Sequence, residues 1–246
     1  MKNLLLIIDP QNDFADPKGS LYVNGAEEAI ENICKFINTN NPTDILISQD
    51  THQKFSIGFP DFWDDQELKP FDKIKVQDII DRKINPKHLK RKLTFILQFN
   101  GKEKESITIW PYHCLEGSWG WCFPSPLIDA LNNWNVRNRK EYEIFKKGYI
   151  PELESYSIFT ESNVQYLKIR LPEKLEDIYD RIYISGFCKD ICVAESLKDL
   201  KQRENELYKD KLVFLDNCMA TLDPESPNLK IYEELVSEFG AKIENA

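Results

Sequence analysis

Residues 3–8 read "NLLLII", a continuous apolar run that ends at Asp9. A run without polar alternation is typical of a strand that is covered on both faces, as in a parallel sheet. Residues 25–38 then carry apolar side chains at helical spacing, and residues 43–50, "TDILISQD", form a second short apolar run. Strand, helix and strand in this order predict a parallel sheet whose strands are joined by crossover helices.

The same alternation resumes in the second half of the chain. It predicts helices at 125–134, 190–204 and 228–239, and strands at 141–145, 182–186 and 211–215. We therefore expect an α/β fold with three α/β/α layers around a mostly parallel, doubly wound sheet. One domain is expected over residues 1–246, with a polar insertion at about 59–108 that holds the alternating piece "KLTFILQF". A second small strand insertion is expected at 163–172.

Composition narrows the classes of partner. The net charge is −9, which disfavours nucleic acid and anionic membranes because both are polyanions that bind Lys- and Arg-rich surfaces. The longest apolar runs are strand-sized, so no membrane span is expected. The six cysteines are scattered and form no CxxC pair, and no export signal is evident. These features predict reduced thiols and a cytoplasmic location.

Acidic, basic and thiol side chains follow the predicted strands. In doubly wound sheets, ligands bind beyond the carboxyl ends of the strands. The residues expected at that edge are Asp9, Asp50, His52, Lys146, Lys147, Cys188 and Cys192. We expect the site there.

Three of these residues have both a chemical and a structural interpretation. Cys192 falls in the first turn of a predicted helix, whose dipole favours a thiolate, but a free cysteine is also a common core residue. Asp9 would be partly desolvated, which raises a carboxyl pKa and suits a proton shuttle, although "DPQND" is also good turn chemistry. Lys147 could hold a thiolate and a carboxylate ionised; alternatively it is a surface lysine, and Lys146 competes for the role.

A metal site is the second chemical hypothesis. Asp50 and His52 are two positions apart, on one face of an extended segment. His113 lies in "IWPYHCLEG", on a loop fixed by proline. One carboxylate and two imidazoles suit zinc, iron or manganese with positions left open for water or substrate.

Five motifs carry a family resemblance. They are "LLIIDPQNDF" (5–14) with "GSL" (19–21), "ISQDTH" (47–52), "IWPYHCLEGSWG" (109–120), "KKGYIPELESYSIF" (146–159) and "ISGFCKDICVAES" (184–196). In this order the chain resembles the isochorismatase-like cysteine hydrolases, and within them the nicotinamidases.

The resemblance implies roles for individual residues. The family's acid, lysine and nucleophile fall on Asp9, Lys147 and Cys192. Its metal ligands fall on Asp50, His52 and His113, and a divalent metal is implied, with zinc ahead of iron or manganese.

The resemblance also implies how a substrate is held. The substrate-binding side chains fall on Phe14, Trp110, Tyr156 and Phe187. The family's cis peptide bond falls on Phe187–Cys188, and its oxyanion hole falls on the N–H groups of Cys188 and Cys192. The chain departs from the pattern at Thr51, where a Trp is usual, and at Lys189, where a Thr is usual. It also lacks a second histidine in "QKFSIGF".

The implied activity is hydrolysis of a small heteroaromatic carboxamide, such as nicotinamide, to the acid and ammonia through a cysteine thioester. The partner would be a small amide, and a homo-oligomer is left open. Alternatives are another small amide or carbamoyl compound as substrate, a non-catalytic metal-binding protein, and a thiol–disulfide switch through Cys188 and Cys192.

Overall fold

The central sheet has six strands in the order β5-β2-β1-β6-β7-β8. The computed structural model describes residues 1–88, 106–159, 179–204 and 210–246 of the chain, without the side chains of 202–204. The strands are β1 (Asn3–Ile8), β2 (Asp44–Asp50), β5 (Glu143–Lys147), β6 (Arg181–Gly186), β7 (Leu212–Met219) and β8 (Lys242–Glu244). All neighbouring pairs are parallel. The strand order reverses between β1 and β6, so the predicted doubly wound sheet is confirmed.

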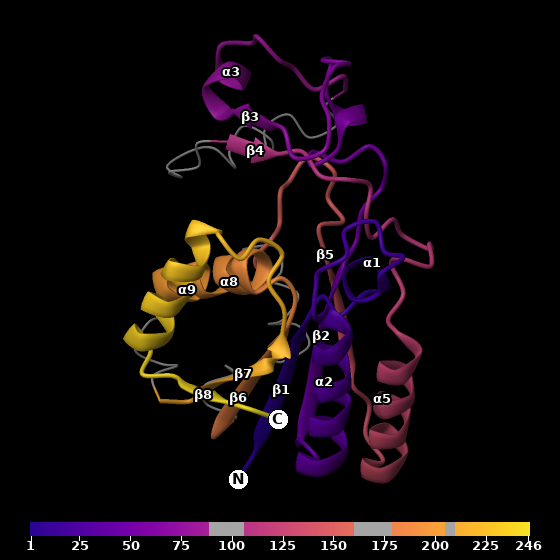
Figure 1. Cartoon of the computed structure of the whole chain (residues 1–246), viewed down its shortest axis with the longest axis vertical. Coiled ribbons are helices and arrows are strands. Elements are labelled where there is room, and N and C mark those ends of the chain that lie inside the picture. The colour runs from indigo at the N-terminus through magenta and orange to yellow at the C-terminus, as the bar shows by residue number, and fades with distance from the viewer. Residues whose placement is uncertain (89–105, 160–178, 205–209) are drawn as a thin grey trace.

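Helices cover both faces of this sheet (Figure 1). α2 (Ala26–Asn40) and α5 (Ser125–Asn138) lie on one face, and α8 (Ala194–Glu204) and α9 (Pro227–Glu238) lie on the other. Along β1, Leu5 and Ile7 pack in the core beneath α2 and α5, while Leu4 and Leu6 pack beneath α8 and α9. Both faces of the strand are therefore buried, which explains the unbroken apolar run. The three-layer prediction is confirmed.

The polar insertion extends beyond the carboxyl edge of the sheet (Figure 1). It holds a short 3-10 helix (Pro60–Phe62), β3 (Lys73–Lys75), α3 (Val76–Ile80) and β4 (Ser106–Thr108), and β3 pairs with β4 in antiparallel fashion. A separate apolar cluster that includes Trp63, Ile74 and Ile107 stabilises it. The alternating piece at 92–99 and the strand expected at 163–172 lie outside the described residues. That the chain is one domain stays a prediction.

Two differences from the sequence-based prediction bear on the site. The strand expected at 141–145 is observed as Glu143–Lys147, because pairing with β2 continues to the position where Asp50 lies opposite Lys147. The helix expected at 190–204 begins as a π-helical turn, Lys189–Val193, before α8. None of the helices in the described residues combines the length and apolar character that crossing a membrane requires.

Candidate active site and metal centre

At the switch point between β1 and β6, the segments that follow these two strands lie next to each other. Gly186 has a φ of +108°, and a Cβ there would lie 2.0 Å from the carbonyl oxygen of Ile8. Only glycine permits this approach, and Phe187 then donates its N–H to the same oxygen at 2.7 Å. The residues that follow β1 and β6, Asp9 and Cys188, are thereby held at one edge of the sheet.

Lys147 is the centre of the site and is only 1% exposed. Its Nζ lies 2.9 Å from Asp9 Oδ2 and 3.1 Å from Asp50 Oδ1. It donates to the carbonyl oxygen of Ser155 at 3.2 Å and contacts Cys192 Sγ at 3.6 Å. A single buried ammonium therefore joins the acid and the thiol that the sequence singled out.

The neighbouring lysine points the other way. Successive side chains on a strand alternate between its faces. Lys146 is exposed, pairs with Glu116 at 2.6 Å and lies over the ring of Trp121 at 4.9 Å from its centroid. Of the two lysines, Lys147 is therefore the one that contacts Asp9 and Cys192.

Asp9 is a buried carboxylate with one oxygen left for proton transfer. Burial raises its pKa above the ordinary value, although the charge of Lys147 opposes the rise. Ser48 Oγ donates to Oδ1 at 2.7 Å, whereas Oδ2 faces Lys147 and accepts no further hydrogen bond from the described residues. A carboxylate with a raised pKa is a better proton acceptor than an exposed one.

The thiol of Cys192 is held in its protonated form. Burial raises its pKa well above the ordinary value; Lys147 opposes this, while Asp9 and Asp50 add to it. The expected preference for a thiolate at a helix start is thus outweighed by burial and two carboxylates. A nucleophilic role for Cys192 would therefore require a base, and the carboxylate that shares Lys147 Nζ with Cys192 Sγ is that of Asp9.

Asp50, His52 and His113 converge on one point. Asp50 Oδ2 lies 2.9 Å from His52 Nε2 and 3.4 Å from His113 Nε2, and the three ligand atoms lie within 4.8 Å of one another. Burial raises the pKa of Asp50, but the charges of His52 and Lys147 bring it well below its ordinary value. The carboxylate is therefore ionised, as a metal ligand must be.

The hydrogen bond of His113 tests whether this group fits a metal ion. Its Nδ1 lies 2.8 Å from the carbonyl oxygen of Pro111, which can only accept. Nδ1 therefore carries the hydrogen, and in the neutral ring Nε2 presents a lone pair toward Asp50 Oδ2. Two such electron-rich atoms repel each other unless a proton or a metal ion lies between them. The donor set fits a divalent metal ion.

An aromatic pocket opens beside both groups. It encloses about 590 Å³, open solvent at its mouth included. Trp110 donates its Nε1–H to Tyr156 Oη at 2.8 Å, and the Phe14 ring lies 5.5 Å from that of His113. The lining also includes Asp50, His52, Phe59, Cys188, Ile191 and Cys192. A flat ring entering this pocket would lie next to the thiol of Cys192 and to the side chains of Asp50 and His52.

The structure does not place Phe187 in the pocket. Its side chain is fully buried in the core on the α2 and α5 side and is not part of the pocket lining. The Phe187–Cys188 peptide bond is cis, as the resemblance implies. Cys188 lines the pocket, and its N–H has no hydrogen-bond partner among the described residues. This amide is available to a substrate oxygen.

Two residues that support the site, Gln11 and Phe59, were not identified from the sequence. The side chain of Gln11 makes two hydrogen bonds to the backbone of Asp50. Its Nε2 donates to the carbonyl oxygen of Asp50 and its Oε1 accepts the N–H of Asp50, each at 2.7 Å. The ring of Phe59 lies 5.3 Å from that of His52. Gln11 could have been identified from the sequence, because it is a polar residue in the turn that follows a buried strand. Phe59 could not have been identified in this way, because it lies at the start of a polar insertion.

The departures from the family pattern make local contacts. Thr51 Oγ1 accepts the indole N–H of Trp121 at 3.0 Å. Lys189 pairs with Asp216 at 2.6 Å, away from the pocket lining. Both residues support the loops around the site.

Gly148→Ala should weaken metal binding. Gly148 has a φ of +72°, and a Cβ there would lie 2.8 Å from His52 Cε1 and 3.0 Å from Asp50 Oδ1. We expect a Kd for Zn²⁺ raised by about 10-fold or more, because the collision displaces two ligands. Calorimetric titration of the metal-free protein measures it. Gly25→Ala is the matched control: it has a φ of +84° but nothing within 4 Å, so it shares the backbone strain without the collision. Equal affinity in the two variants would contradict this role.

Comparisons with known proteins give relatives in both sequence and fold. No model of a known protein family matches the chain. The chain is 28% identical over 234 residues to the nicotinamidase of Saccharomyces cerevisiae, with 94% of each chain covered. Its fold is similar to that of the yeast nicotinamidase bound to the inhibitor nicotinaldehyde, with a TM-score of 0.68, 22% identity and coverage of 99% of this chain and 100% of that chain. It is also similar to the pyrazinamidase of Pyrococcus horikoshii in complex with zinc, with a TM-score of 0.59, 19% identity and full coverage of both chains. The chain is thus similar in sequence to a nicotinamidase, and its fold is similar to those of a nicotinamidase and a pyrazinamidase.

Proposed function

We propose that the protein hydrolyses a small heteroaromatic carboxamide, nicotinamide, to the carboxylic acid and ammonia through a thioester on Cys192. The observation that carries this proposal is that Lys147 Nζ contacts both Asp9 Oδ2 and Cys192 Sγ at the carboxyl edge of the sheet. The sequence similarity to a nicotinamidase supports the choice of substrate.

The first half of the reaction forms the thioester. Asp9 accepts the proton of the Cys192 thiol as the sulfur attacks the amide carbon. The carbonyl oxygen becomes an oxyanion, which the N–H groups of Cys188 and Cys192 stabilise. The C–N bond then breaks as Asp9 returns the proton to the leaving nitrogen, and ammonia departs.

The second half restores the enzyme. Water attacks the thioester carbon and passes a proton to Asp9, the C–S bond breaks, and the sulfur regains a proton from Asp9. Throughout, Lys147 keeps a positive charge beside Asp9 and Cys192, because the carboxylates of Asp50 and Asp9 outweigh the effect of burial and raise its pKa well above the ordinary value. The lysine therefore stabilises anions and is not a proton donor.

The pocket accounts for a planar substrate. Phe14, Trp110 and Tyr156 supply aromatic surfaces for a flat ring. Asp50, His52 and His113 would hold the divalent metal, for which we propose zinc. When bound, this ion supplies a Lewis-acid position for a heteroatom of the substrate ring.

Nicotinamide hydrolysis and its loss on chelation test the proposal. We expect the purified protein to release nicotinate and ammonia in equal amounts, and a chelator to lower kcat/KM because the ring is then poorly oriented. Readdition of Zn²⁺ should restore activity. Benzamide, which lacks the ring nitrogen, is the matched substrate and should turn over more slowly and with less dependence on metal. Release of no ammonia from nicotinamide by the metal-loaded protein would contradict the proposal.

A further inference from the structure

Asp13 is a buried carboxylate that the mechanism does not use. It lies in the short helix α1 (Asn12–Ala15), directly before the pocket residue Phe14, and is 8% exposed. Its Oδ2 accepts the N–H of Cys114 at 2.7 Å, and its Oδ1 accepts the N–H of Ser20 at 2.9 Å. Each of its carboxylate oxygens accepts a backbone N–H, which suits a group that fixes a loop.

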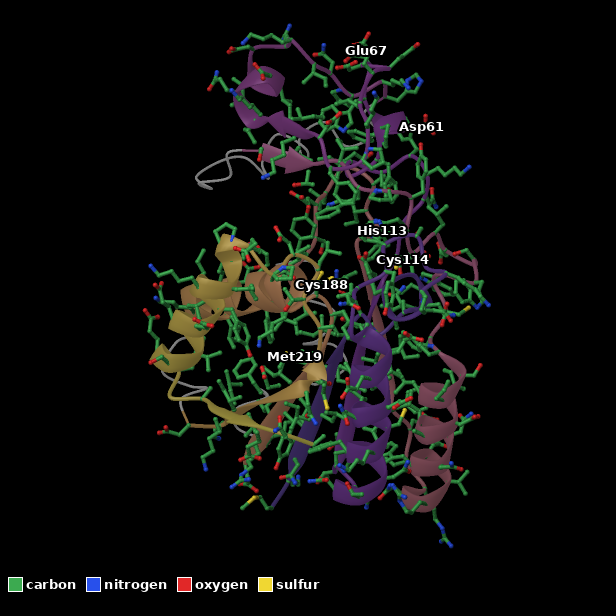
Figure 2. All side chains as sticks on the ribbon, in the orientation of Figure 1. Asp61, Glu67, His113, Cys114, Cys188 and Met219 are labelled. Carbon is green, nitrogen blue, oxygen red and sulfur yellow. The ribbon has the colours of Figure 1, made fainter. Side chains whose placement is uncertain are left out.

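Cys114, which Asp13 holds, connects the two histidines of the metal centre. It follows His113 directly, and its carbonyl oxygen accepts the N–H of His52 at 3.0 Å. Figure 2 shows His113 and Cys114 side by side above the sheet edge. One peptide segment is thus bound to Asp13 at its amide and to the backbone of His52 at its carbonyl.

The conformation of Cys114 requires such a hold. Its φ is +48°, in the left-handed region that a residue with a Cβ rarely occupies. A conformation of this kind persists where surrounding contacts enforce it. The short bond from its N–H to the Asp13 carboxylate is such a contact.

Gly120 shows how closely the loop fits around the carboxylate. Its carbonyl oxygen accepts the N–H of Asp13 at 3.0 Å, and a Cβ on Gly120 would lie 2.1 Å from Asp13 Oδ2. The loop that begins near His113 therefore closes around Asp13 from both ends.

We propose that Asp13 is a positioning residue for the metal centre: by holding Cys114 in its left-handed conformation, it sets the relative placement of His113 and His52. The inference rests on the metal site of the proposed function. Groups that orient metal ligands contribute to affinity although they do not touch the ion.

Asp13→Asn tests this role through metal affinity. The variant keeps the shape of the side chain but places an NH₂ group against one of the two amide donors. We expect the Kd for Zn²⁺, measured by titration of the metal-free full chain, to rise about 10- to 100-fold. Asp16→Asn is the matched control, with the same chemical change just beyond the end of α1. Within the described part of the chain its carboxylate accepts only the N–H of Lys18, and the affinity of this variant should equal that of the wild type. A purely structural role would lower Tm and leave Kd unchanged, and that result would overturn the inference.

A second substitution gives a rescue. Glycine adopts a positive φ without strain, so Cys114→Gly in the Asp13→Asn background should recover most of the lost affinity. If Asp13→Asn fails to fold, Gly120→Ala takes its place, since it displaces the carboxylate without removing it; unchanged affinity there would overturn the inference. Absence of Zn²⁺ binding by the wild type would contradict the metal site itself, whereas normal binding by the wild type and by both variants would contradict only the role of Asp13.

Discussion

Cys192→Ala is expected to abolish amide hydrolysis while the protein remains folded and keeps its metal affinity. Alanine fills most of the space of the thiol, and Asp50, His52 and His113 are untouched. Without the sulfur no thioester forms, so kcat should fall by roughly 10⁴-fold or more. Steady-state ammonia release measures the loss, and titration with Zn²⁺ and nicotinamide measures retained binding.

Cys188→Ala is the matched control for this experiment. Both thiols are buried, both line the pocket, and they are four residues apart. In the proposed mechanism Cys188 contributes its backbone N–H, which alanine keeps, so most of the activity should survive. A Cys188→Ala variant as inactive as Cys192→Ala, or a Cys192→Ala variant that still releases ammonia at the wild-type rate, would contradict the assignment of the nucleophile. A thiol–disulfide switch through these two residues would be abolished equally by either substitution.

The fold was predictable because its core strands are buried on both faces. The run "NLLLII" has no polar side to mask it, and the helix at 25–38 shows its buried stripe in the spacing of Ala26, Ile30 and Ile33. β8 was missed because it has three residues, all of them exposed, and thus no apolar pattern. The end of β5 was misplaced because Lys146 and Lys147 look like the start of a loop, whereas one of them points into the core.

The positions of site residues that directly follow a strand could be predicted from the sequence. The positions of residues that depend on long-range tertiary contacts could not. Parallel strands end at the same edge, so Asp9, Asp50 and Lys147 had to be neighbours once the sheet was known. The burial of Phe187 was not predictable, because the direction of its side chain depends on the positive φ of Gly186. The hold of Asp13 on Cys114 spans 101 positions and leaves no local pattern.

Asp50 connects the two halves of the site. Its Oδ1 faces Lys147 and its Oδ2 faces the two histidines. The carboxylate therefore shares its charge between the ammonium and the metal position. Changes at Lys147 should consequently be felt at both places, and their cost should depend on whether metal is bound.

Lys147→Met is expected to be the most destabilising single substitution at the site. Methionine keeps the length of the side chain but leaves Asp9 and Asp50 buried without their cation. Removing one partner of a buried ion pair commonly costs about 3–5 kcal/mol of unfolding free energy. Hydrolysis should also be lost, because no charge remains to stabilise the thiolate. Denaturant unfolding of the metal-free and metal-loaded proteins measures the cost, which should be smaller with metal bound because the ion compensates Asp50.

Lys146→Met makes the same chemical change one residue away, on the outer face of β5. Its ion pair with Glu116 is exposed, so its loss should change the unfolding free energy by no more than about 1 kcal/mol and leave hydrolysis intact. Adding Asp9→Asn to Lys147→Met removes one of the two uncompensated charges and should recover part of the stability but none of the activity. That split separates the structural role of the ion pair from its chemical role. A Lys147→Met variant as stable as Lys146→Met would show that Asp9 and Asp50 do not depend on the ammonium, and the proposed charge arrangement around Cys192 would then be wrong.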